Sequence, residues 1–224
     1  MTVTTEPDAA APRAPWPLDA QRLLLHNVAW EQYGSLLQAL DDRHVRLTYD
    51  HGNLEFMTLS AEHERYKHLL RRLIEVLGEE AGVSMQGLGS TTYRRADLER
   101  GLEPDECYYI QSWPQVRGKK RIDLTVDPPP DLVVEIDVTH SSLDRMTIYA
   151  ALGVPEVWRF DGEALRVYRL SPEGRYAPTD YSPTFPALPL TEFARFVQHG
   201  ATADELSMIR TFRTWVREQL DAKR

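Results

Sequence analysis

The chain has 224 residues, of which 42% are hydrophobic and 27% charged, as is ordinary for a globular protein of one domain. Its formal net charge of −8 argues against tight, non-specific binding to nucleic acid, although it does not exclude a local basic groove. No apolar run approaches the ~18 residues of a membrane span, and the single cysteine, Cys107, excludes an internal disulfide, so we expect a cytoplasmic protein with no membrane-embedded segment.

The N-terminal segment differs in composition from the rest of the chain. Residues 1–19 are rich in Ala, Pro and Thr and show no periodicity, which is typical of disorder. Structured patterns begin at Leu23. We therefore expect a disordered lead over 1–19 and a single domain over 20–224, extended by helices at its C-terminus.

Apolar periodicity predicts an alternation of helices and strands along this domain. The predicted helices are 29–41, a long helix capped by Ser60 and ending near Gly82, 142–152 capped by Ser141 or Ser142, 191–198 and 203–220. The predicted strands are 46–49, 53–59, 83–94, 105–112, 131–138, 155–160 and 165–170, with hairpin turns at 50–52 and 161–162. This order predicts an α/β or α+β domain in which helices flank a mixed sheet.

The first turn of the long helix carries polar residues where its apolar stripe should continue. Projected back from the middle of the helix, the stripe passes through Glu62 and His63, so we expect both side chains to face the core. Glu64 falls on the solvated face with Lys67 and Arg71. His63 is therefore either a hydrogen-bonded core histidine or a residue that orients a carboxylate.

Acidic residues interrupt two strands that should be apolar. Asp105 opens the strand 105–112, and Glu135 and Asp137 share one face of the strand 131–138. One interpretation is an antiparallel strand with one solvent-exposed side. The other is a cation site, because carboxylates ~7 Å apart along a strand repel each other and a divalent ion such as Mg²⁺ or Mn²⁺ takes oxygen ligands.

A basic run, 117–121, allows two interpretations. It is either a solvated loop or a loop that contacts phosphates. The sequence pattern leaves both open.

Several segments resemble the Uma-type family of restriction-endonuclease-like proteins, within the PD-(D/E)XK superfamily. They are 102–105, 130–135, 141–142, 148–158 and the first half of the long helix, 60–73, and together they span roughly residues 25–165. The resemblance implies a central mixed sheet and a Mg²⁺-dependent (or Mn²⁺-dependent) phosphodiesterase site. It also implies a nucleic-acid substrate, DNA by analogy with the family.

The resemblance also assigns roles to particular residues. Asp105 matches the acid of the Pro-Asp motif and Glu135 the second acid, and these two are the expected metal ligands. The superfamily's lysine position holds Asp137 here, which we expect to be a catalytic residue and a candidate third ligand of the ion. Arg145 stands where the family commonly has lysine, and it would contact the scissile phosphate or, alternatively, pair with Asp137 or Asp144; arginine is too basic to act as a proton acceptor.

The first-helix glutamate of the superfamily is either Glu62 or Glu64, of which periodicity favours Glu62, and His63 stands at the family's frequent histidine position. The sequence thus predicts a metal-dependent nuclease. The alternative is a nuclease fold that has lost catalysis and serves as a binding or scaffold module.

The resemblance and the exposed-looking apolar residues Ile209, Phe212 and Trp215 on the last helix further suggest a homodimer.

Overall fold

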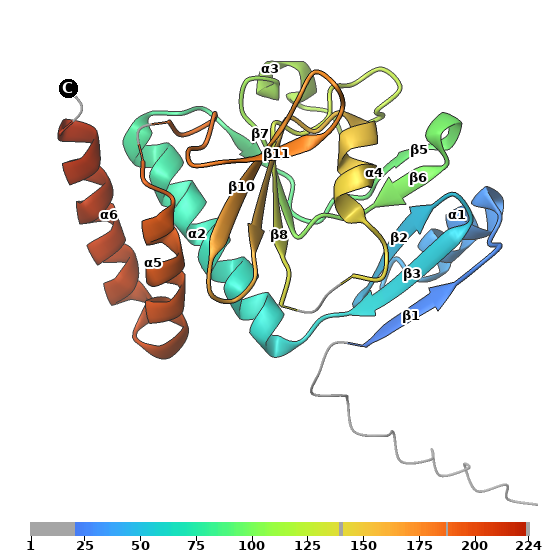
Figure 1. Cartoon of the computed structure of the whole chain (residues 1–224), viewed down its shortest axis with the longest axis horizontal. Coiled ribbons are helices and arrows are strands. Elements are labelled where there is room, and N and C mark those ends of the chain that lie inside the picture. The colour runs from blue at the N-terminus through green and yellow to red at the C-terminus, as the bar shows by residue number, and fades with distance from the viewer. Residues whose placement is uncertain (1–20, 139–140, 187, 223–224) are drawn as a thin grey trace, which may run out of the picture.

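The computed structural model describes residues 21–138, 141–186 and 188–222 (Figure 1). The predicted disordered lead, 1–19, lies outside these residues. The helices are α1 Trp30–Ala39, α2 Ala61–Ala81, α3 Trp113–Val116, α4 Arg145–Leu152, α5 Thr191–Thr202 and α6 Glu205–Asp221. The strands are β1 Arg22–Leu25, β2 Val45–Asp50, β3 Asn53–Thr58, β4 Gln86–Gly87, β5 Tyr93–Arg95, β6 Arg100–Leu102, β7 Glu106–Tyr109, β8 Leu132–Ile136, β9 Glu156–Phe160, β10 Leu165–Leu170 and β11 Tyr176–Thr179.

The N-terminal part forms an antiparallel sheet with the strand order β1-β3-β2-β6-β5. The predicted hairpin is confirmed: Asp50 pairs with Asn53, and His51 and Gly52 between them both have positive φ, as a tight two-residue turn requires. Helix α1 packs on this sheet through Tyr33, whose ring stacks on that of Tyr49 with centroids 4.9 Å apart. The sequence predicted a single sheet, so this separate N-terminal sheet was not expected.

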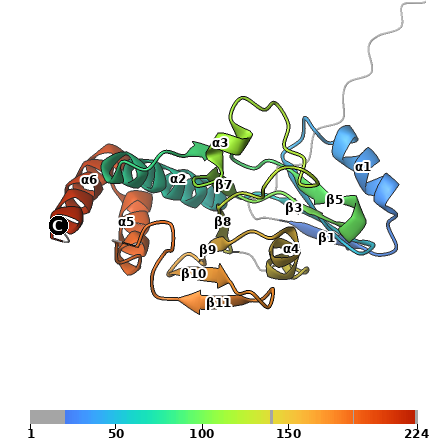
Figure 2. The ribbon, with the colours of Figure 1, turned by 90° about the horizontal axis from the view of Figure 1, so that it is seen from above.

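The other sheet has the strand order β11-β10-β9-β8-β7-β4 and is the mixed central sheet that the sequence predicts. Strands β8 and β9 are parallel and α4 connects them, whereas the other pairs are antiparallel. Helices α2, α5 and α6 lie on one side of this sheet and α4 on the other (Figures 1 and 2). Alternation along β8 therefore sends Val134 into the α2 core and Val133 into the α4 core.

The ends of α2 are set by local signals. Ser60 caps the helix by accepting a hydrogen bond of 3.1 Å from the His63 amide, and Gly82 ends it with φ of 65°. Leu70 and Leu73 belong to the predicted apolar stripe of this helix, and both are buried. These predictions are confirmed.

Three predicted details are wrong. The strand 83–94 is two short strands, β4 and β5, which belong to different sheets. Helix α4 begins at Arg145, and its cap is Asp144, which accepts from the amides of Met146 and Thr147. The serines expected to cap it instead donate to Glu55 of β3, Ser141 through its hydroxyl and Ser142 through its amide.

The apolar residues of the last helix are not exposed as expected. Ile209 and Phe212 are buried between α6, α5 and α2, and Trp215 packs against the same cluster. These side chains therefore give no reason to place a dimer interface on α6. Every helix in the described ranges is also too short or too polar to cross a lipid bilayer.

Candidate active site

Two buried acids lie opposite each other where the two sheets meet. The chain leaves the N-terminal sheet after β6 and enters the central sheet at Asp105, directly before β7. In the β7–β8 pair Glu106 lies opposite Val134, so continuing the register by one residue places Asp105 opposite Glu135. Opposed residues of an antiparallel pair have Cβ atoms ~5 Å apart on the same side. Asp105 Oδ2 also accepts a hydrogen bond of 2.6 Å from the amide of Ile136, the residue after Glu135.

The carboxylate of Glu135 is held by the first turns of α4. Arg145 binds it in a bidentate manner, Nη2 donating to Oε1 at 2.7 Å and Nε to Oε2 at 3.1 Å. The hydroxyl of Tyr149, one turn further along, also donates to Oε1. Burial raises the pKa of Glu135; Arg145 opposes this shift, and the negative charge of Asp105 adds to it.

Arg145 connects α4 to three other segments. Besides its bonds to Glu135, its Nη1 donates to Thr48 Oγ1 of β2 at 2.6 Å, and its Nη2 donates to the Glu103 carbonyl at 2.7 Å. All three guanidinium nitrogens therefore donate within the protein. The buried ion pair with Glu135 keeps the pKa of Arg145 above its already high ordinary value despite the cost of burial.

The carboxylate of Asp105 is enclosed by two cations. Arg46 of β2 donates from Nη1 to Oδ1 and to the Pro104 carbonyl, and His63 Nε2 lies 3.1 Å from Oδ1. Burial opposes ionisation, but the charges of Arg46 and His63 hold the pKa of Asp105 well below its usual range. Burial likewise opposes the imidazolium, yet the neighbouring carboxylates raise the pKa of His63 to about 9. Both shifts favour the charged form, of the acid and of the histidine.

The first turn of α2 is arranged differently from the expectation. His63 is buried, as predicted, and it reaches Asp105. Glu62, however, is exposed and accepts a bond of 3.4 Å from Tyr66, so its predicted core-facing position is wrong. Glu64 lies closer to the site, with Oε1 3.7 Å from His63 Nδ1. The stripe runs through His63 alone, because each neighbouring residue is rotated ~100° around the helix.

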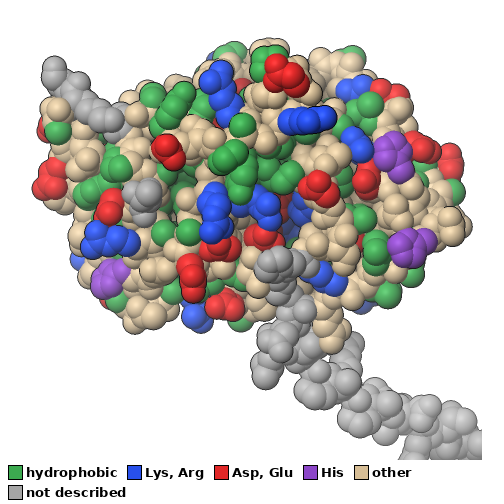
Figure 3. Space-filling model, viewed as in Figure 1, with side chains coloured by type: hydrophobic (Ala, Val, Ile, Leu, Met, Phe, Trp, Pro, Cys, Tyr) green, Lys and Arg blue, Asp and Glu red, His purple; other side chains and the backbone are tan. Residues whose placement is uncertain are grey.

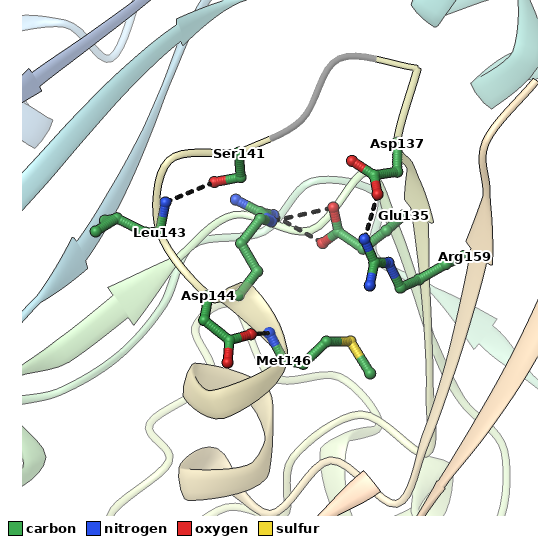
Figure 4. Close-up of a pocket in the computed structure, with 8 residues that line it drawn as sticks. Glu135, Asp137, Ser141, Leu143, Asp144, Met146 and Arg159 are labelled. Atoms are coloured by element: carbon green, nitrogen blue, oxygen red, sulfur yellow. Dashed lines mark hydrogen bonds and ion pairs between the residues drawn. The ribbon is translucent and has the colours of Figure 1, made fainter. Parts of the chain in front are cut away.

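Asp137 lies beside the carboxylate pair but binds another residue. It forms an ion pair with Arg159 of β9, and both residues line a cavity of about 200 Å³ (Figure 4). The alternative in which Arg145 pairs with Asp137 or Asp144 is therefore wrong. The late start of α4 makes Asp144 the helix cap and turns Arg145 toward Glu135. The cavity is lined by Glu135, Asp137, Ser141, Leu143, Asp144, Arg145, Met146 and Arg159.

Charges of both signs surround this region. Figure 3 shows Lys and Arg next to Asp and Glu over the middle of this face, without a continuous basic band among the described residues seen there. The basic run 117–121 follows α3, at the end of β7 and β8 that lies away from Asp105 and Glu135 (Figure 1). It is exposed, Arg117 lies over the Trp113 ring, and Lys119 pairs with Asp127. These positions favour the solvated-loop interpretation.

Asp105 and Glu135 are the residues that could hold a metal ion. Within the described residues, no group of three or more His, Cys, Asp or Glu side chains is arranged to bind one. The two acids supply carboxylate oxygens, the donors that Mg²⁺ and Mn²⁺ take together with water and substrate oxygens, so the donor chemistry fits. Arg145 and Arg46 already neutralise these two acids. An ion therefore has to replace at least one guanidinium contact.

The sequence did not identify three residues that take part in this region, namely Arg46, Glu55 and Arg159. Arg46 opens a predicted strand, but its carboxylate partner lies 59 residues away. Glu55, buried in β3, binds the segment before α4 and also Arg22. Arg159 stands in an apolar strand, and this interruption was the one signal that could have marked it.

Two comparisons with known proteins gave matches. Residues 30–203 match the protein family Uma2, described as putative restriction endonuclease. The chain is also similar to a solved structure of a putative nuclease belonging to DUF820 from Anabaena variabilis, with 15% identity and a TM-score of 0.48, over 67% of this chain and 90% of that chain. No curated protein matches.

Proposed function

Because the chain belongs to the Uma2 family of putative restriction endonucleases, we propose that it hydrolyses phosphodiester bonds of nucleic acid, foremost DNA, with Mg²⁺ or Mn²⁺ at Asp105 and Glu135. The observation that carries this proposal is that two buried acids lie on neighbouring segments, since Asp105 accepts a hydrogen bond from the amide of Ile136, the residue after Glu135. A buried acid is costly unless it is paired or binds a cation. Both acids here have a guanidinium partner, and their oxygens are also the donors that a divalent cation takes.

The surrounding side chains prepare these acids for that role. Arg46 and His63 keep Asp105 ionised, and Arg145 with Tyr149 fixes the orientation of Glu135. When bound, the ion would polarise the phosphate and lower the pKa of a bound water. Arg145 has no part in proton abstraction, because its pKa is higher than that of an ordinary arginine.

One observation favours a second candidate function, a nuclease fold without catalysis that acts as a binding or scaffold module. The charges of Asp105 and Glu135 are already compensated by buried guanidinium groups. Asp137 also stands where the superfamily has lysine. In such a protein the ion pairs Asp105–Arg46 and Glu135–Arg145 would only hold the two sheets together, and no metal ion would be needed.

Cleavage of supercoiled plasmid distinguishes the two functions. The wild-type protein is expected to nick the plasmid with Mg²⁺ or Mn²⁺ and to stop when EDTA is added. Glu135→Gln should lose activity by about 10²-fold or more, as for loss of one electrostatic group at a transition state. Glu163→Gln, which changes an exposed acid on the β9–β10 turn, is the matched control and should cleave like wild type.

Two outcomes would overturn the proposed nuclease. One is a folded wild-type protein that shows no metal-dependent cleavage, and this outcome would favour the binding module. The other is equal cleavage by wild type and Glu135→Gln, which would trace the activity to a contaminant or to another site.

A further inference from the structure

We infer that Arg159, rather than Arg145, is the residue that contacts the phosphate backbone of the nucleic acid. This inference rests on the proposed function only in taking nucleic acid as the ligand. It does not require that the protein cleaves it. The superfamily's motif supplies a lysine at the position that Asp137 holds here. We infer that Arg159 of the neighbouring strand β9 supplies the positive charge instead.

The strand pairing places Arg159 at the site. Strands β8 and β9 are parallel, and Glu135 is paired with Arg159 in their register. Paired residues of neighbouring strands point to the same side of the sheet, so Arg159 lies on the α4 side next to Glu135. Figure 4 shows its guanidinium at the cavity, facing Asp137.

Arg145 cannot bind a phosphate through two donors without breaking the site. Its three nitrogens already donate to Glu135, Thr48 and the Glu103 carbonyl, and its side chain is only 13% exposed. These bonds use four of its five N–H donors, so a phosphate held through two donors would have to displace one of these acceptors. Loss of the Glu135 contact would leave a buried carboxylate without its counter-ion, which is strongly unfavourable.

The guanidinium of Arg159 has N–H donors that are not engaged in its ion pair. Its side chain is 36% exposed, and in the described part of the chain its one polar partner is Asp137, bound through Nη2. A guanidinium carries five N–H donors in a planar fork that matches two phosphate oxygens. Asp137 thus positions the guanidinium and leaves its other nitrogens directed to the cavity and solvent.

The test measures DNA binding without cleavage. A fluorescein-labelled 20-base-pair duplex is titrated in EDTA at several NaCl concentrations, and fluorescence anisotropy gives Kd and its salt dependence. The proteins are wild type, Arg159→Ala, Arg159→Lys, Asp137→Asn and the control Arg195→Ala. Arg195 is an exposed arginine of α5 that also pairs with a single acid, Glu192.

A phosphate contact by Arg159 predicts opposite effects for the two partners of the ion pair. Arg159→Ala should weaken binding several-fold and lower the slope of log Kd against log[NaCl] by about 1, because one phosphate contact is lost. Asp137→Asn should tighten binding, since it frees the guanidinium and removes a negative charge. Arg159→Lys should keep the wild-type slope, and Arg195→Ala should bind like wild type.

A merely structural ion pair predicts a different pattern. Arg159→Ala and Asp137→Asn would then weaken binding equally, since each breaks the same pair, and this result would overturn the inference. An unchanged salt slope in Arg159→Ala, or a wild-type protein that does not bind the duplex, would also overturn it. If wild type binds through Arg159 but does not nick plasmid with metal, the proposed nuclease fails and the inference stands.

Discussion

Buried charges dominate the site at the scale of single residues. Asp105 and Glu135 are acids that the core would exclude if they were alone, and each has a guanidinium partner, Arg46 or Arg145. Removing one member of a buried pair is far more costly than forming the pair is favourable. The two arginines therefore have a structural role whether or not the site is catalytic.

Arg145→Ala is expected to lower the free energy of unfolding by about 3–5 kcal/mol, because Glu135 is left buried without a counter-ion. The double variant Arg145→Ala/Glu135→Gln should recover a large part of this loss. Arg159→Ala, whose ion pair is partly exposed, should cost no more than about 1 kcal/mol. Urea unfolding at pH 7 measures all three. An Arg145→Ala protein as stable as wild type would contradict the assigned pairing.

At the scale of elements, hairpin turns and helix caps set where each segment begins. Asp161 directly follows β9 and accepts hydrogen bonds from the amides of Ala164 and Glu163, and it pairs with Arg166 of β10. These contacts, the Ala164 amide first, lower the pKa of Asp161 to about 2. The turn is thus stabilised by a carboxylate that is ionised in the folded state.

The depressed pKa fixes the sign of a pH effect. The stabilisation by Asp161 is fully present above the pKa of an unfolded aspartate, 3.8, and is lost as pH falls toward about 2. Because the side chain is partly exposed, we expect Asp161→Asn to cost about 1 kcal/mol at pH 7. The difference from wild type in thermal unfolding should shrink below pH 4. A difference that stays constant down to pH 3 would argue against this role.

The sequence predicted elements best where the signal is local. The β2–β3 turn, the ends of α2 and the strands β8 and β9 follow from residues inside or next to them. The start of α4 does not, because Ser141 is bound by Glu55, which lies 86 residues away in the chain. β4 has two residues and exists only through its pairing with β7.

The same distinction applies to the site. Asp105 and Glu135 interrupt apolar strands, so the sequence marks them. Arg46 is identified only by its partner Asp105, 59 residues away, and Arg159 only by the interruption of an apolar strand. The orientation of Arg145 toward Glu135 depends on a helix start shifted by three residues, a detail that periodicity does not resolve.

At the scale of the whole molecule, two sheets are joined at Asp105 and a pair of C-terminal helices extends the core on α2. The rings of Phe193 and Phe196 surround Phe212 of α6, with centroids 5.2 and 5.0 Å away. The last helices are therefore part of one core with α2 and the central sheet (Figure 2).

This packing predicts that Phe212→Ala lowers the free energy of unfolding by about 3–5 kcal/mol. Leu206→Ala, at an exposed position of the same helix, should change it by no more than about 0.5 kcal/mol. Urea unfolding at two protein concentrations measures both effects and detects any contribution from association. Equal, small effects of the two substitutions would contradict the burial of Phe212.

The thermal stability of the protein with and without Mg²⁺ tests the central claim most directly. An ion that binds only the folded state at ten times its Kd adds about 1.4 kcal/mol, or about 3 °C in Tm for a chain of this size. We predict this gain, relative to NaCl of equal ionic strength, for wild type and for Glu163→Gln. Asp105→Asn and Glu135→Gln, each folded by circular dichroism, should not show it. An equal gain in all four proteins, or none in wild type up to tens of millimolar Mg²⁺, would contradict a metal site at Asp105 and Glu135.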